Sequence, residues 1–443
     1  MKKISLIAAA MFAAVTSMPA AHAEYTPNVN FSGYMRSGLQ HGSSAFTKKR
    51  FVNQVGRLGN ENDTYGELGF GSDIVKVEDT TFSVYAMLAS GSDGEDKDWN
   101  TNNALRQFFV NVNGLFDFDK DANIWIGKRY YKREDVHIAD FYYYNISGTG
   151  AGIDTLTVGP GKLNLAWTRV DHDATYVQDT GYTDDVTYTV KKYTADGVET
   201  EAKGKNAPDK VKVNYFDTRY ELPAWTDATL QFGATYVNVE KDDNGYHKTY
   251  KTEKDWKDAA NLSVELNQGY SLGWNKSILQ AFLGSTASGI HWGDSSGVAT
   301  DTGAGYRFIN TGDTHITDKF GFQHLVNVAY SSGVSAYDNK KSISVVARPF
   351  YQLTKMTRLV AEAGAYVEKT KANDGESSTQ RANKYALAYA ITPDASNFWS
   401  RPELRFYISY VNASDNTDTV GPSKDGFTKT SDFMFGAQVE AWW

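Results

Sequence analysis

The sequence predicts an all-β protein, an antiparallel β-barrel that crosses a membrane with its strands. Three observations carry this prediction: a secretory leader, repeated runs of alternating apolar and polar residues, and a chain with 28 Tyr and 14% aromatic residues. Only every second residue of a barrel strand faces lipid, so such strands give alternation instead of a long apolar span.

Residues 1–23 have the three parts of a secretory signal peptide. Two lysines follow the initiating Met, an apolar stretch covers 4–18, and Ala-His-Ala forms a small-residue cleavage site. The apolar stretch is shorter than the ~20 residues that a membrane-spanning helix needs. We therefore expect an exported mature chain, residues 24–443, that forms a single barrel domain.

Alternation recurs along the mature chain. In 29–36, Val, Phe and Met share one face and Asn, Ser, Tyr and Arg occupy the other. Segments 230–236, 404–410 and 433–443 repeat the pattern, and each has about the length of a tilted membrane strand. Trp443 ends the last run on its apolar face, where an aromatic girdle would lie. A soluble sandwich shows the same alternation, so the leader and the chain length complete the argument.

Residue parity also predicts what lines the barrel. Along 57–67 the odd positions carry Arg, Gly, Glu, Asp and Tyr, which predicts a polar lumen, and Leu58 would then face lipid with Leu68 and Phe70. Segment 105–112 does not fit, because no single parity puts Arg106 inside and its apolar neighbours outside. A β-bulge would reconcile the two requirements.

Composition excludes several classes of function. The chain has no Cys, which excludes thiolate metal sites, a Cys nucleophile and a disulfide-stapled domain. Its net charge of −8 argues against a nucleic-acid partner. The histidines form no metal-binding pair, and the G-x-S-x-G match at 293–297 lacks the strand-turn-helix context of a hydrolase. We expect no catalytic site, no metal and no cofactor.

The stretch 127–152, GKRYYKREDVHIADFYYYNISGTGAG, is too polar for a core and too aromatic for an ordinary loop. Charged groups make strong hydrogen bonds to hydroxyls, and flat rings cover the apolar face of a sugar. The composition therefore favours a saccharide-binding surface, although a solvated charged loop would have similar residues.

This stretch resembles the inward-folded third loop of maltoporins, the maltodextrin-specific channels of the bacterial outer membrane. The similarity continues through VNFSGYMRSG, RLGNENDTYGEL, GKLNLAWTR, SRPELRFYISY and FGAQVEAWW and spans the mature chain. It implies an 18-stranded barrel whose third loop constricts the pore, with about 23 residues for each strand and its connection. It also implies a homotrimer in the outer membrane of a Gram-negative bacterium, with passive diffusion of maltose and maltodextrins.

Maltoporins carry a line of aromatic side chains, the greasy slide, along which the apolar faces of the sugars travel. Leu353 matches its sixth position, which predicts weaker stacking at the far end. Packing or girdle rings are the alternative interpretation. The matching rings are Tyr34, Tyr65, Trp99, Trp274 and Trp442.

Opposite the slide, the family places a track of ionisable residues that bond the sugar hydroxyls. The resemblance also implies that Arg133 and Tyr142 set the narrowest point, while Asn145 departs from a maltoporin acid and Asn62 replaces one cysteine of a loop-bracing pair. The matching track residues are Arg36, Arg57, Glu67, Arg106, Arg133, Asp135, His137, Asp140 and Tyr142.

Alternative functions remain open at this point. The same scaffold could carry another saccharide, such as a β-glucoside or sucrose. A general diffusion porin would not need a file of aromatic residues, and a barrel enzyme would need a Ser-His-Asp group that the sequence does not provide. The expected partners are maltodextrins, outer-membrane lipid and lipopolysaccharide, with phages and a periplasmic sugar-binding protein as further candidates.

Overall fold

The computed structural model describes residues 28–42, 51–92, 102–173, 190–194, 197–201, 210–240, 258–291, 303–334, 337–413 and 431–443. The predicted leader, Trp99 and the 293–297 motif lie outside these ranges. In the described part of the chain, no helix has the length and apolarity needed to span a membrane.

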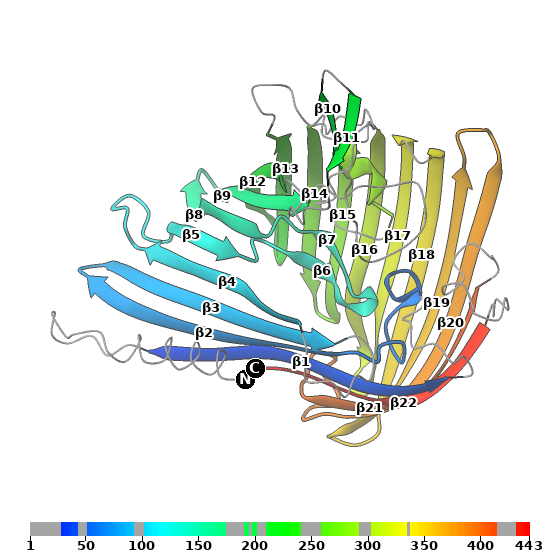
Figure 1. The fold of residues 1–443 in the computed structure, drawn as a ribbon. Helices are drawn as coiled ribbons and strands as arrows, with labels where there is room; N and C mark the ends of the chain where they lie inside the picture. Colours follow the sequence, from blue (N-terminus) through cyan, green and yellow to red (C-terminus); the bar gives the residue numbers. More distant parts are fainter. Residues whose placement is uncertain are drawn as a thin grey trace.

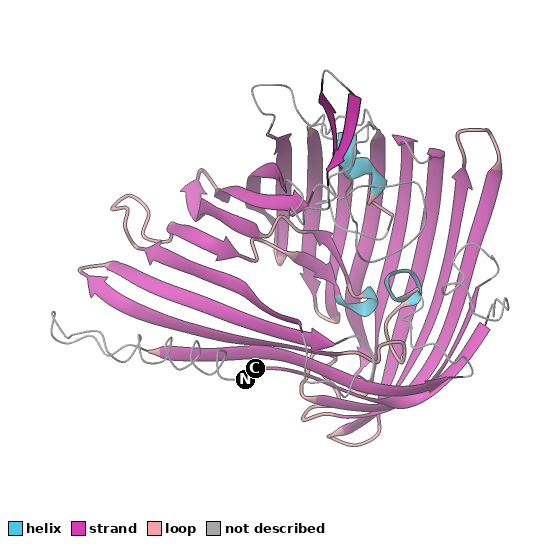
Figure 2. Cartoon of the chain, in the orientation of Figure 1, coloured by secondary structure: helices cyan, strands magenta, loops and turns pink. Residues whose placement is uncertain are grey.

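Eighteen of the described strands form one antiparallel sheet that closes on itself (Figure 1). β1 (Val29–Gly42) pairs with β2 (Thr64–Val77) on one side and with β22 (Ser431–Trp442) on the other, so the first and last strands complete the ring. Strand dominates the cartoon in Figure 2. The predicted all-β, 18-stranded antiparallel barrel is therefore confirmed.

The other strands of the ring follow each other in chain order. They are β3 (Thr80–Ser92), β4 (Asn102–Asn113), β5 (Asn123–Arg129), β8 (Gly148–Val158), β9 (Gly161–Asp173), β12 (Lys210–Trp225), β13 (Ala228–Val239), β14 (Ala259–Tyr270), β15 (Gly273–Leu283), β16 (Ala304–Thr317), β17 (Phe320–Val334), β18 (Tyr337–Gln352), β19 (Thr357–Lys371), β20 (Ser377–Ile391) and β21 (Glu403–Ala413). A separate hairpin, β10 (Val190–Thr194) and β11 (Gly197–Glu201), lies between β9 and β12 in the chain.

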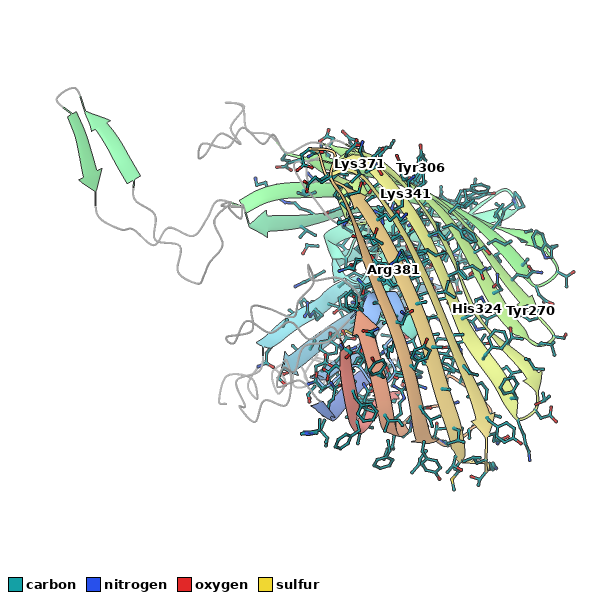
Figure 3. The ribbon with its side chains drawn as sticks, turned by 90° about the vertical axis from the view of Figure 1, so that its right-hand side faces the viewer. Tyr270, Tyr306, His324, Lys341, Lys371 and Arg381 are labelled. Carbon is teal, nitrogen blue, oxygen red and sulfur yellow. The ribbon has the colours of Figure 1, made fainter. Side chains whose placement is uncertain are left out.

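The alternation of the strands sorts apolar side chains to the outer wall and polar ones to the inner wall. In β21, Leu404, Phe406 and Ile408 are 43%, 55% and 47% exposed, whereas the intervening Arg405 and Tyr407 are 3% and 4% exposed. Side chains of the first kind project from the outside of the barrel (Figure 3). An apolar exterior and a charged interior suit a barrel in lipid that encloses a polar channel.

A β-bulge in β4 explains the irregular segment 105–112. Met87 pairs with Gln107 and Leu88 pairs with Leu105, so Arg106 is the extra residue between them. The bulge restores the outward parity of Phe108, which is 55% exposed.

The lipid-facing assignment of Leu58 is wrong. β2 begins only at Thr64, and residues 51–63 form a short helix, α2 (Val52–Val55), and a loop against the inner wall. Leu58 is 1% exposed and packs in a buried cluster with Phe350 and Tyr407. Strand parity could not apply, because this segment is not a strand.

A second segment, between β5 and β8, also lies against the inner wall. It contains β6 (Glu134–Val136), the 3-10 helix η1 (His137–Ala139) and β7 (Phe141–Tyr144). It reaches strands far from its own two: the Tyr143 hydroxyl donates to Glu265 of β14 at 2.6 Å, and Arg307 of β16 donates to the Tyr143 carbonyl at 2.9 Å. The segment is drawn in teal in front of the green and yellow strands in Figure 1.

A third segment, 392–402 between β20 and β21, is fastened to the same wall. Arg358 of β19 donates to the carbonyls of Asn397 and Phe398 at 2.8 and 3.2 Å. Another 3-10 helix, η2 (Gly284–Ser288), follows β15. The inner-wall segments bring residues that are distant in the sequence into one lumen.

Candidate functional site

A cavity of about 710 Å³ lies inside the barrel, between β1, β2, β4, β22 and the segment that joins β5 to β8. Residues predicted from the sequence make up most of its lining. These are Tyr34, Arg36, Arg57, Tyr65, Glu67, Arg106, Arg133, Asp135, His137, Asp140, Tyr142 and Trp442, together with Asn145. Trp274 does not line this cavity, and Trp99 lies outside the described residues.

Arg36 is the centre of one group of charges. Its guanidinium lies 2.7 Å from Asp63, 3.2 Å from Glu61 and 2.9 Å from Asp140. These carboxylates come from the loop before β2 and from the end of η1, so a single cation on β1 joins three parts of the chain. Several carboxylate acceptors around one guanidinium group fix the orientation of the Arg36 side chain in the lumen.

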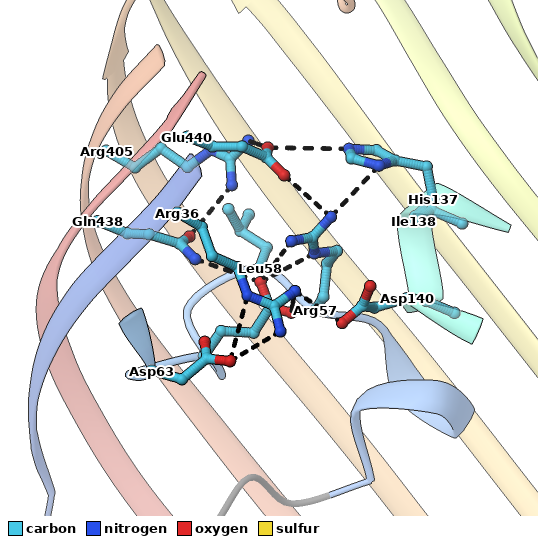
Figure 4. A network of polar contacts seen from close by, with 12 residues as sticks. Arg36, Arg57, Leu58, Asp63, His137, Ile138, Asp140, Arg405, Gln438 and Glu440 are labelled. Carbon is cyan, nitrogen blue, oxygen red and sulfur yellow. Dashed lines mark hydrogen bonds and ion pairs between the residues drawn. The ribbon is translucent and has the colours of Figure 1, made fainter. Parts of the chain in front are cut away.

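Glu440 of β22 is the centre of a neighbouring group (Figure 4). It is fully buried and accepts from the Tyr34 hydroxyl at 3.0 Å, from Arg57 at 3.1 Å and from Arg405 at 2.7 Å. Arg401 adds a further ion pair at 2.8 Å. Sequence analysis missed Glu440, although it stands on the lumenal parity of the last strand.

His137 lies between these charges without being paired as an imidazolium. Burial lowers the pKa of His137 well below its usual range; Glu440 opposes this effect, and the cations Arg57, Arg401 and Arg348 add to it. Arg57 lies 3.3 Å from its Nδ1 and Arg401 lies 3.4 Å from its Nε2, so in either neutral tautomer one ring nitrogen faces an arginine donor. The ring is therefore neutral at physiological pH and accepts a hydrogen bond.

Arg133 and two tyrosines form a stack at the edge of the cavity. The guanidinium lies 3.7 Å from the Tyr130 ring centroid and 4.4 Å from that of Tyr142. Glu67 accepts from the hydroxyls of Tyr65 at 2.6 Å and Tyr130 at 3.0 Å. Burial raises the pKa of Tyr142 to about 12, so its hydroxyl remains a neutral donor.

Aromatic rings continue from this cavity along the lumen. Tyr65 and Tyr34 have centroids 6.2 Å apart, and Tyr34 is the cross-strand partner of Trp442. Trp399 follows, 6.4 Å from Trp442 and 6.4 Å from Trp274. The structure thus has two groups of neighbouring rings, Tyr34 with Tyr65 and Trp442 with Trp399 and Trp274, and the pairing of β1 with β22 brings the two groups together.

Trp399 is a ring that sequence analysis missed, whereas the sequence matched Leu353 to the sixth position of the slide. Leu353 lies in the turn between β18 and β19 and is 44% exposed. Trp399 is held by its indole N–H, which donates to Asp313 at 2.8 Å. The signal was present in the block SRPELRFYISY, because this Trp stands directly before it in the chain.

The arrangement pairs flat apolar surfaces with charged donors and acceptors across one lumen. Rings can cover the apolar faces of a pyranose, while carboxylates and guanidinium groups can bond its hydroxyls. Within the described ranges, no cluster of three or more His, Asp or Glu side chains is placed to hold a metal ion.

Comparisons with known proteins agree on one family. The LamB porin family pattern matches residues 29–443. Maltoporin 1 of Klebsiella pneumoniae is 36% identical over 453 residues, which cover 99% of this chain and 97% of that protein. Maltoporin 2 of Yersinia pseudotuberculosis is 36% identical over 429 residues, which cover 94% of both chains.

Solved structures of other porins are similar at low sequence identity. An anion-selective porin from Comamonas acidovorans has a TM-score of 0.47 and 10% identity, with 94% of this chain and 100% of that chain covered. OccD3 of Pseudomonas aeruginosa has a TM-score of 0.46 and 10% identity, with 97% of each chain covered.

Proposed function

The chain belongs to the LamB porin family, and from this membership we propose that maltose and maltodextrins diffuse passively through its barrel across the outer membrane. As a porin it is a channel and not an enzyme. The observation that carries the sugar specificity is the file of rings that faces charged groups within one lumen. A general diffusion porin has no need of such a file.

The aromatic file supplies contact without a fixed binding site. Each ring stacks on the apolar face of one glucose, and the next ring lies about one sugar further along the lumen. Charged side chains such as Arg36 and Glu67 exchange hydroxyl partners as the sugar moves. Several sites of moderate affinity allow a solute both to enter and to leave.

The segment between β5 and β8 is the proposed constriction. Its Arg133 and Tyr142 stack face the cavity, and its other side is tied to β14 and β16 through Tyr143. Buried hydrogen bonds of this kind hold a loop in place against solvent flow. The width of the channel is therefore determined by a loop that hydrogen bonds to β14 and β16 hold in position.

We further propose that the porin is a homotrimer in the outer membrane of a Gram-negative bacterium. The start of β1 and Trp443 lie at one rim, which would face the periplasm, and the opposite rim would face the cell exterior. Phages would contact the exterior rim, and a periplasmic sugar-binding protein would contact the periplasmic rim.

Another saccharide, such as a β-glucoside or sucrose, is the alternative substrate. Asn145 lines the cavity where maltoporins carry an acid, and this departure favours testing it. Planar-bilayer conductance with maltose, maltohexaose, sucrose and a β-glucoside decides the matter. Maltohexaose should block the ion current most strongly, since it meets the most rings.

Tyr34→Ala and Tyr65→Ala should each weaken block of the current by maltohexaose. Stacking of a ring on a sugar resembles stacking on a base, worth about 1–3 kcal/mol, which is about five- to a hundredfold in affinity. Phe406→Ala, an outer-wall ring, is the matched control and should leave block unchanged. If block is absent, or insensitive to both tyrosines, the maltodextrin proposal fails.

A further inference from the structure

Three cations stand on the outer wall of the barrel, toward the rim opposite to the start of β1 and Trp443. Lys341 of β18 and Lys369 of β19 are direct cross-strand partners, and Arg381 of β20 lies one row below, opposite Val367. All three side chains are exposed. Figure 3 shows Lys341 and Arg381 on this face, outside the channel.

The three charges are not neutralised by their surroundings. Within the described residues, none of them forms an ion pair, whereas the adjacent Lys371 pairs with Asp338 at 2.8 Å. Like charges directly opposite each other destabilise a sheet. Lys341 and Lys369 therefore form an unfavourable pair that an anionic ligand would relieve.

An apolar hollow begins beside these cations. The Lys341 ammonium lies 5.7 Å from the centroid of the Tyr330 ring, and Tyr330 lines a cavity of about 490 Å³ on β14 to β17. Exposed apolar side chains form its walls. They include Leu262, Leu279, Tyr306, Phe308 and Val328.

We propose that this rim surface binds one lipid of the outer leaflet, the phosphorylated and multiply acylated glycolipid that anchors lipopolysaccharide. Phosphate groups of the lipid bridge Lys341, Lys369 and Arg381, and one or more acyl chains occupy the hollow that starts at Tyr330. Lys341 shares a cross-strand row with Tyr330 and Tyr306, so the apolar hollow lies beside the cations on the same wall. Cations beside an apolar hollow match a ligand with an anionic head and apolar tails. A soluble anion would use only the cations, and a neutral lipid only the hollow.

The test is a triple variant, Lys341→Gln, Lys369→Gln and Arg381→Gln. Detergent-solubilised porin is titrated with deep-rough lipopolysaccharide, and bound lipid is counted by native mass spectrometry. Each cation near an anionic lipid surface contributes about fivefold in affinity, so the triple variant should bind about a hundredfold more weakly. The matched control, Lys76→Gln, Lys319→Gln and Lys355→Gln, removes exposed cations near the opposite rim and should bind as wild type does.

Three results would overturn the proposal. The first is equal binding by the triple variant and wild type, and the second is displacement of the lipid by millimolar inorganic phosphate, which would indicate a site for free anions. The third is equal affinity for phosphatidylglycerol, which would remove the preference for the glycolipid. Dephosphorylated lipopolysaccharide should bind wild type as weakly as intact lipopolysaccharide binds the triple variant. Maltohexaose block should be unchanged in the triple variant, so this test is separate from that of sugar transport.

Discussion

At the scale of single residues, Trp399 is the link in the proposed file of aromatic rings. It is the ring that joins Trp442 to Trp274, because it lies 6.4 Å from each. Without it the file divides into two parts. A long oligosaccharide would then lose contact in the middle of its path.

Trp399→Ala should weaken maltohexaose block by about five- to a hundredfold, the range for loss of one stacked ring. Maltose is too short to span the gap, so its affinity should change less. Trp399→Phe keeps a ring and should restore most of the block. Leu353→Trp serves as a contrast and should have no effect; tighter block in that variant, with Trp399→Ala unchanged, would contradict this assignment.

His137 predicts how the channel responds to pH. Its lowered pKa keeps the ring neutral in the folded protein, whereas an ordinary imidazole titrates near pH 6.5. Maltohexaose block should therefore be constant from about pH 8 to pH 5.5. The unfolded chain binds the proton first, so stability falls as the pH drops below about 6.5.

The control for this prediction is His137→Gln, which bonds but does not titrate. It should show the same flat pH profile of block, with a smaller loss of stability in acid. A midpoint near pH 6.5 in wild type that vanishes in the variant would show that the imidazole titrates within the channel.

At the scale of elements, the segment between β5 and β8 is the proposed constriction of the channel. Tyr142→Ala should raise ion conductance and reduce discrimination among sugars, because it removes a phenol that faces the cavity. Tyr142→Phe keeps the ring and should conduct as wild type does. Unchanged conductance in Tyr142→Ala would place the constriction elsewhere.

Some of these elements could be predicted from the sequence and others could not. Alternation identified strands such as 404–410 because one wall of a barrel meets lipid at every second residue. It could not place Leu58, whose segment turns inward before β2 begins. The bulge at Arg106 could be foreseen only because no single parity placed Arg106 inside the barrel and its apolar neighbours outside.

The site was predictable where its residues share a strand or a resembling motif. Tyr34, Arg36 and Trp442 follow from strand parity, and the residues from Arg133 to Tyr142 follow from the resemblance. Strand parity also placed Glu440 in the lumen, and Trp399 stands directly before a resembling block, but the contacts of both residues required the three-dimensional arrangement. Their partners are distant in the sequence. A buried charge or a ring that joins two others can be identified only when those partners are placed next to it.

At the scale of the whole molecule, the purified porin should be β-rich and should remain oligomeric in detergent on heating. Each strand bonds to two neighbours, so the ring has no free edge at which to open. Circular dichroism and electrophoresis with and without boiling test this expectation. A soluble monomer with substantial helix would contradict the fold.

The pairing of β1 with β22 has a consequence for biogenesis. The backbones of Gly33 and Trp443 bond to each other in both directions, at 3.1 and 3.2 Å, so Trp443 extends the seam between β1 and β22. The barrel can therefore close only after β22 has been synthesised and has paired with β1. A nonsense mutation that removes β22 would leave β1 and β21 each with one unpaired edge. Such truncated chains should aggregate or be degraded.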